Sequence, residues 1–192
     1  MPVRGANRAE KRRLFETEAL PHLDAVYTMA VRLARNSDDA NDLVQETVLR
    51  AWRFFDQFEP GTNCRAWLFT ILFNNFRNGY RRSSREQPAA SLDDFEHRIE
   101  TQSVTNEPKA DDPESLVAEQ QPIPEVETAV AALPEEFRSA LLLVDVEEMS
   151  YDDVAQVLNV PIGTVKSRVS RGRALLREAL RGYVREFGIK RS

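Results

Sequence analysis

Cysteine is nearly absent from this chain, because Cys64 is the single one among 192 residues. One thiol excludes an internal disulfide and any zinc site built from several thiolates. No apolar run approaches the roughly 18 to 20 residues that a helix needs to cross a bilayer. The charged stretch from Met1 to Glu18 lacks the apolar segment of a secretory signal. We therefore expect a cytoplasmic protein without a metal site or a membrane anchor.

Groups suited to catalysis are also scarce. His22 and His97 are the two histidines, far apart in the sequence, and no nucleophile, metal cluster or glycine-rich phosphate loop accompanies them. An enzyme therefore has almost no support, and no cofactor is expected. Cys64 begins an expected helix beside Arg65, which would mildly lower the thiol pKa. We favour the alternative, a buried and inert thiol.

The charge is distributed unevenly. The net charge of −5 argues against nucleic-acid binding, but residues 86–122 alone hold ten acids and two bases. Outside that stretch the positive charge forms two clusters. Residues 65–85 contain five arginines and no acid, and residues 159–185 contain seven bases and one acid. Two basic segments flanking an acidic connector are typical of a protein that binds nucleic acid with separate modules.

The acidic stretch also divides the chain. Five of the ten prolines lie in it or just after it, and few large apolar residues separate them. Such a segment cannot bury enough surface to offset its ordering entropy. We therefore predict a flexible, extended linker over residues 87–123, between an N-terminal module at 10–86 and a C-terminal module at 124–188.

Both modules are predicted to be helical, which gives an all-α fold of two small helical domains. Apolar residues recur three and four apart, and no alternating run bounded by turn residues occurs. One apolar pattern runs from Phe15 to Arg35, and Ser37 followed by two aspartates is expected to cap the next helix. A turn over residues 60–63 precedes a helix at 65–82. The C-terminal helices are expected at 124–133, 135–145, 151–158 and 164–187.

A helix-turn-helix is the clearest motif in the chain. Ser150 with Asp153 fits a capping box at the start of a short helix, and Ala155 is small where a second helix must cross closely. The turn follows at residues 159–163. Thr164 would cap the second helix, whose Val165 and Val169 would face inward.

The second helix of this motif would expose a polar and basic side. Its candidate DNA contacts are Thr164, Lys166, Ser167, Arg168, Ser170, Arg171 and Arg173. In a helix-turn-helix the second helix enters the major groove, where Lys and Arg can read guanine and Ser can reach any base. Arginines on its flanks would meet phosphates and set the register. The alternative is an ordinary helical hairpin with a solvated basic face, and we favour DNA binding because turn, caps and charge agree.

The first basic segment is rich in aromatic residues. Aromatic rings alternate with arginines and asparagines there, as single-strand binding requires for base stacking and backbone contact. The rings are Trp67, Phe69, Phe73, Phe76 and Tyr80. The same helical spacing is typical of a buried core, and from these residues alone we favour the core interpretation.

The helix at 38–55 is expected to carry an acidic polar side with one exposed leucine. Its members are Asp42, Gln45, Glu46, Leu49 and Arg53. Such a side is either an ordinary solvated surface or a docking face for a basic protein partner.

Several of these motifs together resemble one family. The stretch 39–47 (DANDLVQET) and the stretch 66–71 (AWLFTI) with Asn74 resemble region 2 of bacterial sigma factors. The stretch 133–138 (LPEEFR), Ser150-Tyr151 and the stretch 161–168 (PIGTVKSR) resemble their region 4. With these two regions and no room for regions 1.1 and 3, the chain resembles the extracytoplasmic-function group of stress-response sigma factors.

The resemblance implies a role for each surface. The acidic side of helix 38–55 would dock on the β′ clamp helices of core RNA polymerase, and region 4 would contact the β flap. The helix-turn-helix would read the −35 promoter element, and the acidic linker would pass near the RNA exit channel. An anti-sigma factor would hold the chain inactive. Recognition and melting of the −10 element would fall to Asn63, Trp67, Asn74, Arg77, Asn78, Tyr80, Arg81 and Arg82.

Two other functions remain compatible with the sequence. One is an operator-binding helix-turn-helix regulator, which would bind DNA tightly without polymerase. The other is a sigma mimic that sequesters an anti-sigma factor. The intact basic residues, from Arg77 to Arg82 and from Lys166 to Arg177, argue against a mimic, because a decoy has no need of them.

Overall fold

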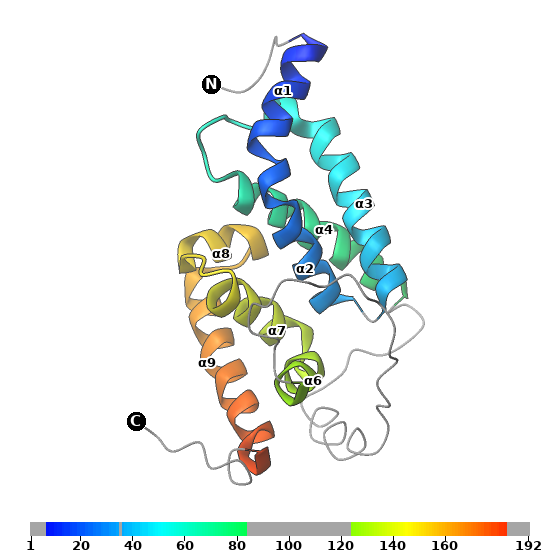
Figure 1. Cartoon of the computed structure of the whole chain (residues 1–192). Helices are drawn as coiled ribbons and strands as arrows, with labels where there is room; N and C mark the ends of the chain where they lie inside the picture. The colour runs from blue at the N-terminus through cyan, green and yellow to red at the C-terminus, as the bar shows by residue number, and fades with distance from the viewer. Residues whose placement is uncertain (1–6, 35, 84–123, 184–192) are drawn as a thin grey trace.

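The computed structural model describes residues 7–34, 36–83 and 124–183, and within them every regular element is helical (Figure 1). This confirms the predicted all-α fold. The predicted acidic linker at 87–123 lies outside the described residues. Among the described residues, no helix is both long and apolar enough to cross a membrane.

The N-terminal module begins with two helices where the apolar pattern predicted one. Helix α1 (Arg8–Glu18) and helix α2 (Leu23–Leu33) are separated by the 3-10 turn η1 (Leu20–His22). The prediction of a single helix from Phe15 to Arg35 was therefore wrong. Pro21 explains the break, because proline lacks an N–H and disfavours the helical conformation of the residue before it.

Helix α3 (Ser37–Phe54) is capped one residue earlier than expected. The side chain of Asn36 accepts a hydrogen bond from the Asp39 backbone N–H at 2.8 Å, so Asn36 is the N-cap and Ser37 is the first helical residue. Asp38 and Asp39 do lie in the first turn, where they favour the helix dipole. The 3-10 turn η2 (Phe55–Gln57) follows directly.

Helix α4 (Cys64–Ser83) is the longest helix of the N-terminal module. Gly61, with φ of 83°, forms the predicted turn before it, and the Asn63 side chain accepts a hydrogen bond from the Ala66 N–H at 3.0 Å. One side of α4 is mostly apolar and buried, and it packs against α2 and α3. The residues of that side are Leu68, Phe69, Leu72 and Phe73, each 0% exposed.

The C-terminal module contains α6 (Pro124–Ala132), α7 (Glu135–Leu141), α8 (Tyr151–Leu158) and α9 (Ile162–Ala179). The predicted single helix at 135–145 changes to the π-helical turn η4 (Leu142–Val146) at its end. Helix α9 begins two residues before the prediction, after Pro161, so Thr164 lies in its first turn and is not its cap. Proline suits this position because its fixed φ is compatible with helix entry.

Helices α7 and α9 approach each other closely at Gly172. A Cβ placed on Gly172 would lie 2.7 Å from Leu141 Cδ1 and 3.3 Å from Phe137 Cβ. Gly172 is itself buried, so the absence of a side chain allows the two helices to pack.

The two modules are in contact through α4 and α8. Figure 1 shows α4 between α2 and α3 of the N-terminal module and α8 of the C-terminal module. Helix α4 therefore takes part in the core of its own module and in the contact with the other.

We predict that Gly172→Val lowers the free energy of unfolding by about 1–3 kcal/mol, because the added methyl groups overpack the α7–α9 contact. The matched control is Gly79→Val in α4, where an added Cβ meets no atom within 4 Å among the described residues. It should change the free energy of unfolding by less than ~0.5 kcal/mol. Urea denaturation followed by circular dichroism measures both, and equal stability of the two variants would contradict the close packing.

Candidate nucleic-acid and protein interfaces

The helix-turn-helix is built by short local contacts. Ser150 Oγ accepts a hydrogen bond from the Asp153 N–H at 3.1 Å and donates one to Asp153 Oδ2 at 2.8 Å. This confirms the serine part of the predicted capping box. Asn159 ends α8 in the left-handed conformation, with φ of 51°, and the Val160 N–H bonds to the Ala155 carbonyl at 3.0 Å. Left-handed Asn is a usual helix stop, so the chain turns here at low cost.

Helix α9 has the buried valine side and the exposed polar, basic side that the sequence predicted. Val165 and Val169 are 0% and 1% exposed and face the core. Four of the predicted DNA contacts are exposed on the helix: Lys166, Ser167, Ser170 and Arg171. Thr164 and Arg168 are half-buried. A helix with buried valines and an exposed basic, hydroxyl-bearing side has the donors that major-groove reading requires.

Arg173 differs from the other predicted contacts of α9 because it already has an anion partner. Its Nε and Nη2 donate to the two carboxylate oxygens of Asp145 at 3.0 and 2.5 Å. This hydrogen bonding raises the pKa of the Arg173 guanidinium above its ordinary value. The pair fixes α9 to η4, so Arg173 would have to exchange Asp145 for a phosphate to contact DNA.

The buried rings of α4 correct the stacking hypothesis. Phe69 and Phe73 are 0% exposed, so both belong to the core and neither can stack on a base without unfolding the module. Trp67 is half-buried and packs 5.2 Å from the Phe58 ring centroid and 6.1 Å from that of Phe55. The core interpretation, which the spacing also allowed, is confirmed for these two phenylalanines.

The polar residues of α4 have different surroundings. Asn63, Asn74 and Asn78 are exposed, and Asn63 also caps the helix. Arg77 is half-buried, and its Nη2 donates to the Leu158 carbonyl at 2.8 Å. Three further predicted contacts lie on α4, but their side chains are outside the described residues: Tyr80, Arg81 and Arg82.

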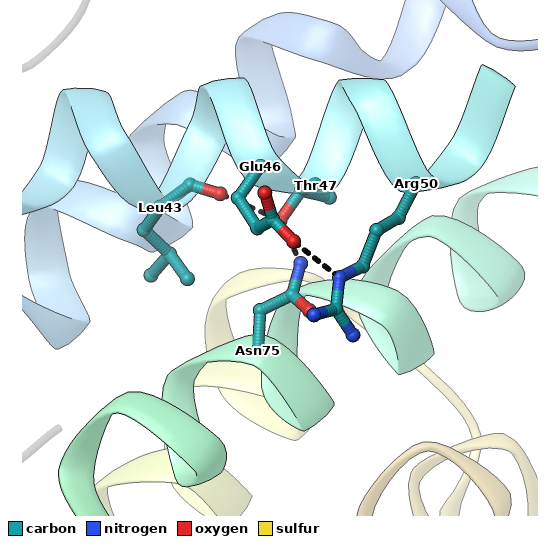
Figure 2. Close-up of polar contacts among 5 residues, drawn as sticks. All are labelled: Leu43, Glu46, Thr47, Arg50 and Asn75. Carbon is teal, nitrogen blue, oxygen red and sulfur yellow. Dashed lines mark hydrogen bonds and ion pairs between the residues drawn. The ribbon is translucent and has the colours of Figure 1, made fainter. Parts of the chain in front are cut away.

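The predicted docking face forms one continuous strip along α3. All five of its members are exposed: Asp42, Gln45, Glu46, Leu49 and Arg53. Leu49 is 64% exposed, the largest value among the exposed large apolar residues of the described chain. Glu46 Oε1 accepts a hydrogen bond from Arg50 Nε at 2.5 Å, which holds the carboxylate on the helix surface (Figure 2).

A buried polar contact beneath this face was not predicted from the sequence. Thr47 is 0% exposed and its hydroxyl donates to the Leu43 carbonyl at 2.7 Å, while Asn75 Nδ2 donates to Thr47 Oγ1 at 3.2 Å (Figure 2). The contact joins α3 to α4 through residues that directly follow Glu46 and Asn74 in the sequence. A threonine at an inward position of the apolar pattern was the signal that could have revealed it.

Two acids of the C-terminal module were also missed by sequence reasoning. Asp145 fixes Arg173, and Glu147, only 5% exposed, pairs with Arg65 of α4. Their partners lie 28 and 82 residues away in the sequence, so helical periodicity holds no signal for either pair.

Cys64 is a buried thiol, as favoured from the sequence. It is 3% exposed, and burial, together with the nearby charge of Glu18, raises the pKa of the thiol to about 12. The thiol therefore stays protonated and unreactive at neutral pH. No group of three His, Cys, Asp or Glu side chains suited to a metal ion occurs in the described part of the chain.

The comparisons with known proteins agree on one family. Residues 20–86 match the model of sigma-70 region 2, and residues 124–176 match the model of sigma-70 region 4. The chain is 40% identical over 158 residues to the ECF RNA polymerase sigma factor EcfG of Rhodopseudomonas palustris, covering 82% of this chain and 78% of that protein. It is 36% identical over 159 residues to the ECF sigma factor SigE of Mycolicibacterium smegmatis, covering 83% of this chain but 58% of that protein.

A solved structure agrees as well. The sigma factor RpoE from Bartonella quintana, crystallised with the anti-sigma factor NepR, superposes with a TM-score of 0.67 at 35% identity. The match covers 87% of this chain and 96% of RpoE. The helix-turn-helix, the exposed strip on α3 and these matches lead to the same conclusion: the chain belongs to the sigma-70 family of transcription initiation factors, in the extracytoplasmic-function group of RNA polymerase sigma factors.

Proposed function

We propose that this chain docks on core RNA polymerase through α3, opens the −10 promoter element with α4 and reads the −35 element with α9. The observation that carries the proposal is the combination of two exposed surfaces on one chain. Helix α3 exposes Leu49 within an acidic strip, and α9 exposes Lys166 and Arg171 above a fully buried valine side. A partner protein and DNA can therefore be engaged at the same time.

The residue composition of the docking face on α3 favours binding to a protein partner. An exposed leucine among charged side chains has the character of an interface centre with a polar rim. In this proposal the strip meets the β′ clamp helices, and the C-terminal module meets the β flap. The proposed work takes place on chromosomal promoters and therefore in the cytoplasm.

The two DNA-reading helices, α4 and α9, should bind a promoter more tightly together than either would alone, because they belong to one chain. Each module alone offers a small interface, whereas polymerase would hold both at a fixed spacing on one DNA. Binding of one promoter element then raises the effective concentration of the other module at its own element. The chain supplies recognition and strand opening, and the polymerase performs the chemistry.

We also propose control by an anti-sigma factor, and domain limits near 10–86 and 124–188 on either side of the linker. The control is supported by the RpoE relative, which was crystallised with its anti-sigma factor NepR. In this proposal an anti-sigma factor would compete with polymerase for the surface of α3.

Transcription with purified components tests the proposed function. The chain is mixed with sigma-free core polymerase and genomic fragments, and the run-off transcripts are sequenced. Specific starts preceded by a shared −35 and −10 pair are expected. Tight DNA binding without polymerase, together with an absence of transcripts, would favour the operator-binding regulator. An absence of both transcripts and DNA binding would favour the mimic.

Charge reversal on α3 tests the docking face. Glu46→Lys should reduce the affinity for core polymerase by at least about tenfold, because it reverses a central charge of the strip. Glu16→Lys is a matched control. Glu16 is equally exposed on α1 and pairs with Arg12 at the same helical spacing, so both variants lose one ion pair of this type. Equal polymerase affinity of the two variants would refute the assigned face.

Replacement of Arg171 tests the −35 contact. Arg171→Ala should cost about 1–3 kcal/mol of binding at one −35 base pair if the guanidinium reads a base. Polymerase carrying the variant is compared on a set of promoters with each −35 position changed in turn. Loss at one position confirms base reading, whereas an equal loss on every promoter would make Arg171 a phosphate contact.

A further inference from the structure

A hydrogen bond crosses the apolar contact between α3 and α4. Asn75 Nδ2 donates to Thr47 Oγ1 at 3.2 Å, and the two side chains are 7% and 0% exposed (Figure 2). The Thr47 hydroxyl donates its own hydrogen to the Leu43 carbonyl of α3 at 2.7 Å. This second bond fixes the rotation of the hydroxyl, so its oxygen can only accept from α4, and Asn75 supplies the donor.

The amide of Asn75 is costly to bury. Its Oδ1 has no hydrogen-bond partner within the described part of the chain, and a buried polar atom without a partner is destabilising. Leucine has the same branched shape as asparagine and would fill this place without an unpaired oxygen. It would also leave Thr47 with a partner, because the hydroxyl keeps its bond to the Leu43 carbonyl. Stability alone therefore does not explain an asparagine here.

The amide gives the contact between the helices a preferred direction. The buried side chains of α4, such as Leu72 and Phe73, hold α2 and α3 by apolar burial, which is non-directional. A hydrogen bond tolerates a change in length of only about 0.5 Å. Side chains lie about 5–6 Å from their helix axis, so a rotation of α4 by about 20° would move the amide by about 2 Å. The Thr47–Asn75 bond therefore selects one rotation of α4 against α3, as single buried amides do in other helix pairs.

This rotation also sets the direction of the neighbouring Asn74. Asn74 directly precedes Asn75 on α4, is exposed, and is a proposed reader of the −10 element. On the other helix, Thr47 directly follows Glu46 of the docking face. The hydrogen bond thus links the helix that polymerase would hold to the helix that would read the DNA.

We propose that Asn75 is a positioning residue for −10 recognition: held by Thr47, it fixes the rotation of α4 and so the direction in which Asn74 meets its base. The inference rests on the proposed function, because it takes Asn74 as the reader. Asn75 is buried and acts only through its neighbour. Its effect should appear at the base that Asn74 reads, whereas the −35 element, which α9 reads, should be unaffected.

Run-off transcription by core polymerase carrying the full chain tests this role. Each −10 and −35 position of one promoter is changed in turn, and discrimination is the ratio of transcription from the unchanged to the changed promoter. Asn74→Ala first identifies the −10 position that Asn74 reads. Asn75→Leu should lower discrimination at that position at least about fivefold, the scale of one base contact, and leave −35 discrimination at the wild-type value. Its resistance to urea should be no lower than that of the wild type, because the unpaired oxygen is removed.

Two variants of Thr47 separate the hydrogen bond from packing. Thr47→Val removes the hydroxyl at nearly the same shape and should reproduce the loss of −10 discrimination. Thr47→Ser keeps the hydroxyl and should retain the wild-type discrimination. Thr70→Val is the matched control, because the Thr70 hydroxyl donates to the Ala66 carbonyl at 2.9 Å and bonds to no other helix among the described residues. It should leave discrimination at both elements unchanged.

The inference and the proposed function fail differently. An absence of specific run-off starts with the wild-type chain would refute the proposed function. With such starts present, wild-type discrimination in Asn75→Leu, an equal loss at −10 and −35 positions, or an equal loss in Thr70→Val would overturn the positioning role. The absence of any −10 position that depends on Asn74 would overturn it as well.

Discussion

The fold depends on how α4 divides its surface. Its apolar side, with Phe69 and Phe73, forms the core of the N-terminal module and fixes the helix in place. The remaining surface holds the exposed Asn74 and Asn78, together with Arg65 and Arg77, which contact the C-terminal module. The helix is therefore fixed in its own module, and its polar side is divided between exposed amides and the contact with the C-terminal module.

Charge distribution reconciles an acidic chain with DNA binding. The net charge of −5 arises from the acidic stretch at 86–122, while the exposed side of α9 remains basic. Internal acids also hold individual arginines in the free protein, as Asp145 holds Arg173 and Glu147 holds Arg65. We propose that these two arginines stabilise the fold when the chain is free. On a promoter, Arg173 of the DNA-facing helix α9 would exchange Asp145 for a phosphate group.

The sequence predicted those features of the fold that depend on residues close together in the chain. Helical periodicity gave the all-α fold and the buried side of α9, and the strip on α3 followed from the same spacing. Errors arose where one residue overrides the pattern, as Pro21 does between α1 and α2 and Asn36 does at the start of α3. The pair Arg65–Glu147 could not be predicted, because only tertiary packing brings residues 82 positions apart together.

The distance between the modules, with and without polymerase, is the most direct test of this account. Dyes on Thr28→Cys and Ala174→Cys, both exposed, report the distance between α2 and α9 by energy transfer. The native Cys64 does not compete for label, because it is buried and the pKa of its thiol is raised to about 12. We expect high transfer in the free chain and a clear decrease when core polymerase is added. Equal transfer in the two states would contradict the proposal that polymerase holds the two modules at promoter spacing.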